Sequence, residues 1–259
     1  MSTSPKTVLV FSGGMDSTTL LYQLHRESHE LFALGINYGQ RHQVELDYAR
    51  ALAEKLAVPF EVADLSPITR LISNSSQTDR SIPVPIGHYS AENMKATVVP
   101  NRNMIMLAVA AGWAINLKAN HVAYAAHGGD HAIYPDCRSE FADAVGTAIG
   151  LSDWHQVSLI RPFVALSKAD IAILGRDLCV PFEETWSCYE GGKVHCGACG
   201  TCIERRESFI IAGMSDPTRY SDLAPMLCVK RGSVSAIDWS RTIDGNAMPM
   251  TPQQEESES

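Results

Sequence analysis

A short polar turn between two apolar segments is the most distinctive pattern near the amino terminus. Residues 12–17 read Ser-Gly-Gly-Met-Asp-Ser; the apolar run of residues 7–11 precedes them, and leucines at helical spacing follow. An unbroken apolar run is typical of a parallel strand buried on both faces. Glycines let a ligand approach the main chain, and backbone N–H groups at a helix start bind phosphate. The pattern therefore predicts a strand, a phosphate-binding turn and a helix.

Asp16 narrows the chemistry that this turn can support. From the two glycines alone, a turn whose serine and aspartate merely cap the helix is an equal alternative. A carboxylate beside phosphate is unfavourable, however, unless a divalent cation lies between them or the carboxylate faces the helix amides. Neither the Walker sequence nor the dinucleotide-binding sequence is present. We therefore expect a phosphate site of another kind, with Mg²⁺ near Asp16.

Polar clusters follow two further predicted strands. Residues 38–42 (YGQRH) come after the strand expected at 31–37, and residues 127–131 (HGGDH) come after the one expected at 121–126. Ligands bind at the carboxyl ends of parallel strands, so both clusters should lie beside the phosphate loop. Further strands are expected at 60–62 and 157–162.

Two side chains near these clusters leave alternatives open. Asp130 and His131 are possible metal ligands, but their spacing matches no known zinc pattern, and ordinary hydrogen bonding is favoured. Cys137 is either a nucleophile or a small buried hydrophobic residue, and the second interpretation is favoured because no base is evident.

Two cations stand where a helix is expected to begin. Arg102 precedes the apolar helix expected at 104–117, and Lys168 follows Ser167, which is predicted to cap its helix in a capping-box variant with Asp170. Either Asn101 or Asn103 can serve as the N-cap of the helix expected at 104–117. A cation at a helix amino terminus is unfavourable without an anion. Both cations are therefore predicted to contact phosphate or carboxylate.

Four cysteines follow the spacing C-x7-C-x2-C-x2-C with interleaved glycines. Four thiolates on short loops suit one structural, tetrahedral zinc ion per chain. An iron–sulfur cluster is the main rival, and a chance grouping is the less favoured alternative. The predicted ligands are Cys188, Cys196, Cys199 and Cys202. Lys193, His195, Arg205 and Arg206 are expected to offset the charge of the site, while Cys179 and Cys228 are expected to be structural.

Length and composition place limits on the class of protein. The chain has 259 residues, 45% of them hydrophobic, a net charge of −8 and a pI of about 5.6. One large domain, or a domain with an appendage, is expected. The acidic balance argues against a broad nucleic-acid surface. No signal peptide and no apolar stretch long enough to span a bilayer are evident, so we expect a cytoplasmic protein without a membrane partner.

The motifs together resemble a known family. Residues 12–17 are similar to the S-G-G-x-D-S loop of the PP-loop ATP pyrophosphatases. With residues 37–42, 99–103, 134–138 and 185–188 and the cysteine cluster, the chain resembles the 7-cyano-7-deazaguanine synthases of the queuosine pathway up to about residue 220. One departure is Asn101, which stands where the family more often has glycine; asparagine tolerates the left-handed conformation.

The resemblance implies a fold and a division of the chain. The expected fold is α/β, a Rossmann-like doubly wound parallel sheet of the N-type ATP pyrophosphatase (adenine nucleotide alpha hydrolase-like) kind, with a small zinc subdomain. Residues 1–180 would form the ATP-binding domain and 181–220 the zinc subdomain with a helix at 201–212. The extension 221–259 lies beyond the resemblance, and the acidic, apolar-poor composition of residues 250–259 predicts that it is partly disordered. Residues 66–98 are expected to be a lid or mobile loop. A homodimer is also implied.

The implied reaction converts 7-carboxy-7-deazaguanine, ATP and ammonia to the nitrile, with AMP and pyrophosphate as products. The same carbon is adenylated twice, first as the acid and then as the amide. Alternatives are a relative that stops at the amide or joins the deazaguanine to another amine, a tRNA-modifying PP-loop enzyme, and a non-catalytic nucleotide sensor. The expected partners are small molecules, without direct nucleic-acid contact.

The resemblance also implies roles for residues of the matching motifs. ATP with Mg²⁺ would be bound by Phe11, Ser12, Gly13, Gly14, Met15, Asp16, Ser17, Thr18, Gln40 and Arg41. The catalytic residues would be Asp16, Arg102, Arg138 and Lys168. Of these, the two arginines would stabilise charge on the α-phosphate and the substrate carboxylate. Substrate contacts would come from Asp130, Tyr134, Asp136 and Arg138, with one of the two aspartates accepting hydrogen bonds from the guanine-like edge.

Overall fold

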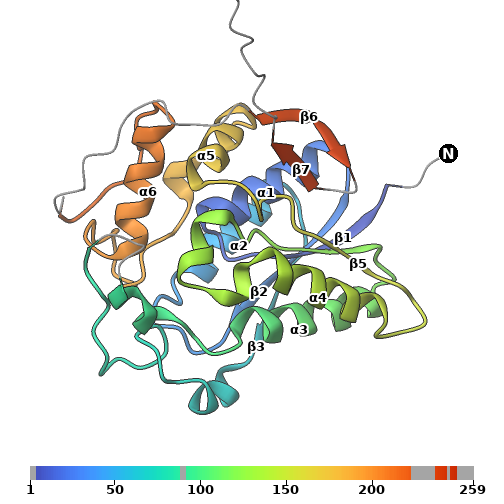
Figure 1. Cartoon of the computed structure of the whole chain (residues 1–259), viewed down its shortest axis with the longest axis horizontal. Helices are drawn as coiled ribbons and strands as arrows, with labels where there is room; N and C mark the ends of the chain where they lie inside the picture. Colours follow the sequence, from blue (N-terminus) through green and yellow to red (C-terminus); the bar gives the residue numbers. More distant parts are fainter. Residues whose placement is uncertain (1–3, 88–91, 223–236, 244–245, 250–259) are drawn as a thin grey trace, which may run out of the picture.

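A parallel sheet of five strands forms the centre of the computed structural model, which describes residues 4–87, 92–222, 237–243 and 246–249 (Figure 1). The strand order is β3-β2-β1-β4-β5, and every pairing is parallel. The strands are β1 (Lys6–Val10), β2 (Glu30–Asn37), β3 (Phe60–Asp64), β4 (His121–Ala123) and β5 (Ser158–Ile160). The order runs outward in both directions from β1, which makes the sheet doubly wound and confirms the predicted fold class.

Helices cover both faces of this sheet. Residues of α3 and α4 share one buried cluster with Val8, whereas residues of α1, α2 and α5 share another with Leu9. Successive residues of β1 therefore point to opposite faces, as the period of a strand requires. The helices are α1 (Met15–Arg26), α2 (Glu45–Lys55), α3 (Arg102–Asn116), α4 (Ser139–Gly150), α5 (Lys168–Asp177) and α6 (Gly200–Ile211).

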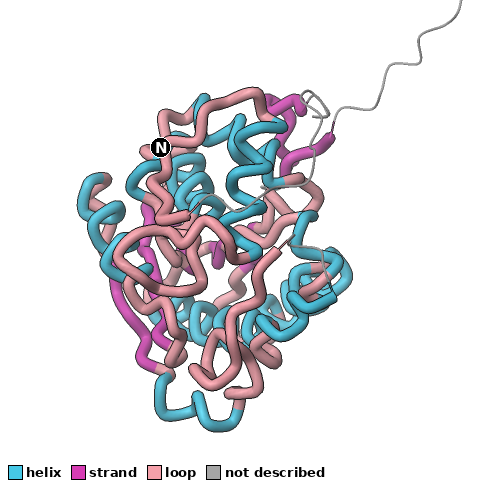
Figure 2. Tube along the Cα trace, turned by 90° about the vertical axis from the view of Figure 1, so that its left-hand side faces the viewer, coloured by secondary structure: helices cyan, strands magenta, loops and turns pink. Residues whose placement is uncertain are grey.

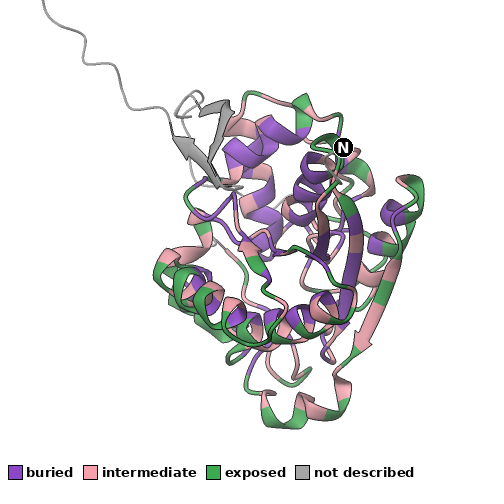
Figure 3. Ribbon diagram, turned by 90° about the vertical axis from the view of Figure 1, so that its right-hand side faces the viewer, coloured by how far each residue is buried: buried purple, intermediate pink, exposed green. Residues whose placement is uncertain are grey.

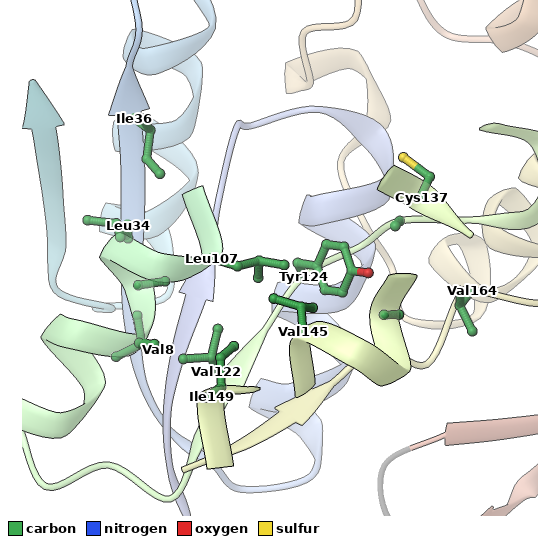
Figure 4. Packing of buried hydrophobic residues seen from close by; sticks show 14 of the residues in the cluster. Val8, Leu34, Ile36, Leu107, Val122, Tyr124, Cys137, Val145, Ile149 and Val164 are labelled. Atoms are coloured by element: carbon green, nitrogen blue, oxygen red, sulfur yellow. The ribbon is translucent and has the colours of Figure 1, made fainter. Parts of the chain in front are cut away.

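A buried apolar cluster lies between the sheet and helices α3 and α4, and it explains why the sequences of the central strands have no polar break. Val8, Val122, Leu107, Val145 and Ile149 point toward one another from two strands and two helices (Figure 4). The central strands β1, β2 and β4 are largely buried, while the edge strands and the outer faces of the covering helices are more exposed (Figure 3). Burial of these side chains stabilises the fold by about 1.5–3 kcal/mol each.

The predicted strands and most of the predicted helices agree with the structure to within a few residues. Helix α4 was not predicted, and much of the chain between elements is loop (Figure 2). The long loop predicted at 66–98 contains two short 3-10 helices, η1 (Ser66–Leu71) and η2 (Glu92–Thr97), at its two ends. Shorter 3-10 helices occur at η3 (Gly128–Ala132), η4 (Pro135–Cys137) and η5 (Phe182–Glu184).

One segment corrects the expectation about membrane spans. Glu92–Asn116 is long and apolar enough to meet the criterion for a spanning helix by length and composition alone. The α-helix within it has only 15 residues. It packs Leu107, Ala110 and Ala114 into the core beside the sheet, and core helices of this kind also meet such a criterion.

Beyond residue 222 the described chain is a hairpin. Strands β6 (Ile237–Ile243) and β7 (Asn246–Pro249) pair antiparallel. The apolar residues Ile237 and Trp239 predict one further short packed piece from the sequence, and both fall within β6. The disorder expected for part of the extension falls on residues outside those described, which include the acidic end at 250–259.

Gly13 offers a direct test of the turn after β1. Its φ is +71°, and a Cβ there would lie 2.6 Å from the backbone nitrogen of Ala49 in α2. We expect Gly13→Ala to destabilise the protein by at least about 1–2 kcal/mol, the cost of left-handed backbone, measured as a lowered Tm. Gly112→Ala is the control, because no atom lies within 4 Å of a Cβ at that exposed position of α3. Equal melting temperatures for both variants would contradict this account of the turn.

Candidate active site

A cavity of about 220 Å³ lies at the carboxyl ends of the central strands. Its lining comes from the segments that follow β1, β2 and β4, from the first residues of α3 and α5, and from the cysteine-containing segment. In an open parallel sheet this edge, at the point where the strand order reverses, is the usual ligand site. The sheet therefore places the predicted polar clusters around one space.

The turn after β1 presents backbone amides to this cavity. Gly14 is the N-cap of α1, and no side chain caps the helix. The Oγ atoms of Ser12 and Ser17 lie 3.1 Å apart, and Ser17 also donates to the carbonyl oxygen of Gly14. The serines thus bond within the turn, and the alternative in which they and Asp16 only cap the helix does not describe this structure. The first amides of a helix have no partner within the helix, and such amides suit phosphate.

Lys168 occupies the centre of a cluster of charged groups. Its Nζ lies 2.9 Å from Oδ2 of Asp16, 3.1 Å from Oε2 of Glu204 and 3.3 Å from Nε2 of His127. Burial lowers the pKa of Lys168, but Asp16 and Glu204 raise it by more, so the lysine remains a cation. Burial raises the pKa of Asp16, while Lys168 and His127 lower it by more, so Asp16 is ionised.

The same cluster has oxygen atoms suited to a divalent cation. Oδ1 of Asp16 is buried and has no hydrogen-bond partner among the described residues. One ligand atom from each of His127, Asp130 and Glu204 also lies within 4.8 Å of the others. Carboxylate oxygens are the ligands that Mg²⁺ prefers. Asp16 therefore fits the predicted position next to a metal-bound phosphate.

Arg102 lies at the other end of the cavity among neutral side chains. Its guanidinium carbon is 5.9 Å from the ring centre of Tyr134, and Tyr38 and Tyr189 are its other neighbours. Burial raises the pKa of Tyr38 to about 12, so this hydroxyl is neutral. No carboxylate of the described chain makes an ion pair with Arg102. A partly buried cation without a counter-ion suits an anionic ligand.

Two further residues of the cavity were not among the predicted site residues. Gln40 donates from Nε2 to Oε1 of Glu45 at 2.9 Å, and Nε2 of His42 lies 3.4 Å from Oε2 of Glu45. The two residues are His42 and Glu45, which line the cavity together with Tyr124 and Tyr189. Glu45 stands in the first turn of α2, where an acidic residue is common, so the local sequence gave no sign of its role.

Several predicted site residues do lie at the cavity. Asp16, Arg102, Asp130, Tyr134 and Lys168 line it, as do Phe11, Ser12, Gly14, Met15 and Ser17 from the loop. Gly13 and Thr18 of the same loop do not line the cavity, and Thr18 is fully buried. The convergence of three strand ends accounts for this grouping.

Other predicted site residues lie elsewhere, among them Arg138, which is exposed and donates from Nε to the carbonyl oxygen of His131 at 3.0 Å. Gln40 is buried beneath Glu45. Arg41 donates to the carbonyl oxygens of Asp79 and Ile82 and so anchors the loop before η2. These three residues do not line the cavity, so their positions lend no support to the predicted contacts with ATP or substrate.

Asp136 has a structural task in the described chain. Its Oδ2 accepts from the backbone nitrogen of Asn103, in the first turn of α3, at 3.0 Å. Asn101 is the N-cap residue, with φ of +57°, yet its side chain makes no capping bond. The left-handed conformation expected at Asn101 is thus observed, but the cap comes from a distant aspartate.

Cys137 lies at the cavity as a neutral thiol. Its sulfur accepts from Nδ2 of Asn103 at 3.2 Å, and burial raises its pKa well above the ordinary value. A nucleophilic cysteine needs the opposite shift. The interpretation as a small buried residue, favoured from the sequence, therefore fits the structure.

The four predicted cysteine ligands converge. Their Sγ atoms all lie within 4.8 Å of one another, and those of Cys196 and Cys202 are 3.9 Å apart. With Zn–S bonds of about 2.3 Å, the edges of a tetrahedral site measure about 3.8 Å. A four-iron cluster would hold the sulfurs farther apart, because it places a cube of atoms between them. The group therefore fits a single tetrahedral metal ion.

The four residues expected to offset the negative charge of the cysteine site differ from one another in charge, burial and contacts. Burial and Arg205 lower the pKa of His195 to about 4, so the imidazole is neutral. Arg206 donates to the carbonyl oxygen of Gly197, between two ligands, and Lys193 is exposed. Arg205 is fully buried and fixes the chain before the first ligand, because it donates to Thr185, Ser187 and the carbonyl oxygen of Phe182.

The cysteine-containing segment forms part of the cavity. The backbone nitrogen of Trp186 donates to the carbonyl oxygen of Gly13 at 2.9 Å. Ser187, Tyr189 and Thr201 line the cavity beside it, and Glu204 reaches Lys168 from α6. Glu204 follows the last cysteine by two positions and carries no local signal, which is why the sequence analysis missed it.

Comparison with known proteins identifies the family. The model of the family described as "Queuosine biosynthesis protein QueC" matches residues 6–213. The chain belongs to the QueC family. It is 52% identical over 219 residues to a 7-cyano-7-deazaguanine synthase of Rhizobium rhizogenes, which covers 84% of this chain and 92% of the relative. The family membership predicted from the motifs is thereby confirmed.

A second relative and a solved structure add to the comparison. A 7-cyano-7-deazaguanine synthase of Brucella anthropi is 53% identical over 220 residues, covering 84% of this chain and 94% of the relative. The structure of an NMN synthetase from Francisella tularensis aligns with a TM-score of 0.46 and 17% identity, over 82% of this chain and 79% of the other.

Asp136→Ala separates a capping role from substrate binding. We expect loss of the bond to Asn103 to lower the free energy of unfolding by about 0.5–2 kcal/mol, measured by denaturant titration. The KM for every substrate should stay unchanged, because the side chain does not line the cavity. A raised KM with unchanged stability would contradict the structural role.

Cys199→Ser tests the metal site independently of activity. We expect the purified variant to contain less than one bound metal ion per chain by elemental analysis and to melt at a lower temperature. Structural zinc sites contribute about 10–16 kcal/mol of apparent binding energy at neutral pH. Cys179→Ser, at an exposed cysteine outside the cluster, is the matched control. Equal metal content in both variants would argue against this ligand set.

Proposed function

We propose that this QueC-family chain is a 7-cyano-7-deazaguanine synthase of the queuosine pathway, an ATP-dependent carbon–nitrogen ligase. Its substrates are 7-carboxy-7-deazaguanine, ATP and ammonia, and its products are the nitrile, AMP and pyrophosphate. The observation that carries the proposal is the identity of 52% to relatives named for this activity over 84% of the chain. The cavity supports it with a phosphate-binding end and an unpaired arginine in one space.

In this proposal the phosphate end binds the pyrophosphate part of ATP. The amides at the start of α1 and the ammonium of Lys168 would contact phosphate oxygens, and Asp16, whose Oδ1 is buried without a partner in the described chain, would hold Mg²⁺. The cation would neutralise charge on the phosphates as pyrophosphate departs. Lys168 is already held by Asp16 and Glu204, so it is positioned before ATP arrives.

Arg102 binds the substrate carboxylate next to the α-phosphate in this proposal. Burial raises the pKa of its neighbours Tyr38 and Tyr189, so these hydroxyls are neutral and leave the attraction of the guanidinium for an anion undiminished. In low dielectric such an interaction is much stronger than in water. Of the two aspartates predicted to accept hydrogen bonds from the guanine-like edge, Asp130 lies at the cavity and Asp136 does not. Asp130 is therefore the acceptor in this proposal.

Each conversion uses the ATP site twice. The carboxylate first attacks the α-phosphorus and releases pyrophosphate, and ammonia displaces AMP from the acyl adenylate to give the amide. The amide oxygen then attacks the α-phosphorus of a second ATP, and loss of AMP leaves the nitrile. A single cavity serves both rounds because the same carbon stays beside the same phosphate site.

The proposal includes finer assignments. The four cysteines hold zinc as a structural ion, since four protein ligands leave no open position. Residues 1–180 form the ATP-binding domain and 181–220 the zinc subdomain. The protein is a cytoplasmic homodimer that acts on small molecules and contacts neither nucleic acid nor membrane.

Mass spectrometry of the products tests the function. Purified protein is incubated with 7-carboxy-7-deazaguanine, ATP, Mg²⁺ and ammonium, with Asp16→Ala as the control. We expect nitrile and AMP from the wild type and neither from the variant. Accumulation of the amide alone would point to a relative that stops there. The absence of any ATP-dependent product would overturn the proposal.

Arg102→Met tests the carboxylate contact. Loss of one preorganised charge donor should lower kcat/KM for the acid by about 10²–10³-fold. The loss should be smaller when the amide is supplied, because the amide carries no charge. Arg138→Met is the matched control, since that arginine is exposed and away from the cavity. An equal loss for acid and amide would contradict carboxylate binding.

A further inference from the structure

The carboxyl groups of the cavity have different environments. Three of the described lining residues carry one, namely Asp16, Glu45 and Asp130. Asp16 accepts from Lys168, and Oδ2 of Asp130 lies 3.6 Å from Nε2 of His127. Glu45 lies apart from that charged cluster, near Arg102. None of the binding roles proposed above involves Glu45.

Glu45 is held firmly at the cavity. Its side chain is 12% exposed. Oε1 accepts from Nε2 of Gln40, and this amide group is itself fixed because it also donates to the carbonyl oxygen of Ile36. Nε2 of His42 approaches Oε2 at 3.4 Å. The carboxyl thus has a fixed position on the surface of the reaction space.

The groups facing Glu45 leave its proton exchangeable near neutral pH. Burial raises the pKa of Glu45 to about 7, more than Gln40 and Arg102 lower it. Burial, Arg102 and Arg41 lower the pKa of His42 to about 3, so the imidazole is neutral. Tyr38 is neutral as well. Arg102 of α3 is the cation that acts on Glu45, and a carboxylate poised in this way is an efficient base.

The second half of the proposed reaction needs such a base. Attack of the amide oxygen on the α-phosphorus leaves an O-adenylated imidate whose nitrogen still carries two hydrogens. The C–O bond then breaks, AMP leaves with that oxygen, and the C≡N bond forms as both protons depart. Amide and ATP therefore give nitrile, AMP, pyrophosphate and two protons. No oxidant or reductant is required.

We propose that Glu45 is the general base that takes one of these protons from the imidate nitrogen, while solvent receives the other. The inference rests on the proposed function, which it deepens. The first half has less need of this base, because the nitrogen added by ammonia is positively charged and loses its proton readily to water, as does the doubly protonated imidate. The last proton in nitrile formation leaves a neutral imidate nitrogen while the C–O bond breaks, and this is the proton that Glu45 takes. Glu45 should therefore act chiefly in nitrile formation.

Separate assays of the two halves test this role with Glu45→Gln, which keeps the shape of the side chain. One assay supplies acid, ATP, Mg²⁺ and ammonium; the other supplies synthetic amide, ATP and Mg²⁺. We expect the variant to convert amide to nitrile about 10²–10⁴-fold more slowly and to form amide at close to the wild-type rate, so that amide accumulates. Glu54→Gln, at an exposed position of the same helix, is the matched control.

The pH profile gives a readout that a purely structural role would not move. The wild-type rate of amide conversion should rise as Glu45 ionises, around pH 7, and the variant should lose this dependence. Equal losses in both halves, an unchanged profile or a wild-type rate for the variant would overturn the role of Glu45. If the wild type makes no nitrile from either substrate, the proposed function itself fails.

Stability provides a check that needs no activity. The folded-state pKa of Glu45 is raised above its ordinary value of 4.5. Its contribution to stability is therefore present at lower pH and is lost as the pH rises through about 7. The Tm of Glu45→Gln minus the Tm of the wild type should therefore be larger at about pH 8 than at about pH 5. An identical pH dependence of Tm would show that Glu45 ionises normally and would overturn the proposal.

Discussion

The buried ammonium group of Lys168 ties together the parts of the chain that make up the cavity. Its partners are Asp16 at the start of α1, His127 after β4 and Glu204 in α6. Removing charges from water costs several kcal/mol per ion, which is recovered only when the partners are in place. Each of these elements therefore depends on the others for a stable position, and the phosphate loop is ordered by contacts more than 100 residues away.

The two ends of the cavity differ in how their buried charges are paired. Around Lys168 the charges compensate one another. Around Arg102 the neighbours are neutral, and the charge is left for a ligand. His42 continues this neutral environment, since burial lowers its pKa to about 3, whereas Glu45, with its pKa raised to about 7, is partly ionised near neutral pH. A substrate that spans the cavity thus meets paired charges at one end and an unpaired cation at the other.

The sequence was most informative where chemistry depends on local spacing. The turn at Gly13, the capping box of Ser167 and the four cysteines each involve residues close in the chain, and all are present as predicted. Contacts across the fold were not readable. Glu45 and Glu204 resemble ordinary helix residues until the sheet brings them to the cavity, and Arg138 has a suggestive sequence context but an exposed position.

The hydrogen bond from Trp186 to Gly13 has a consequence for how the protein is made. Residues 186–204, which complete the cavity, leave the ribosome after every strand of the parallel sheet. Chains fold from the amino terminus during synthesis, so the sheet can form before Trp186 and Glu204 are available to fix the turn after β1 and Lys168. The lining of the cavity is complete only once residues 186–201 have been added. A folded sheet can therefore exist before the final third of the chain has been translated, but its cavity is then incomplete.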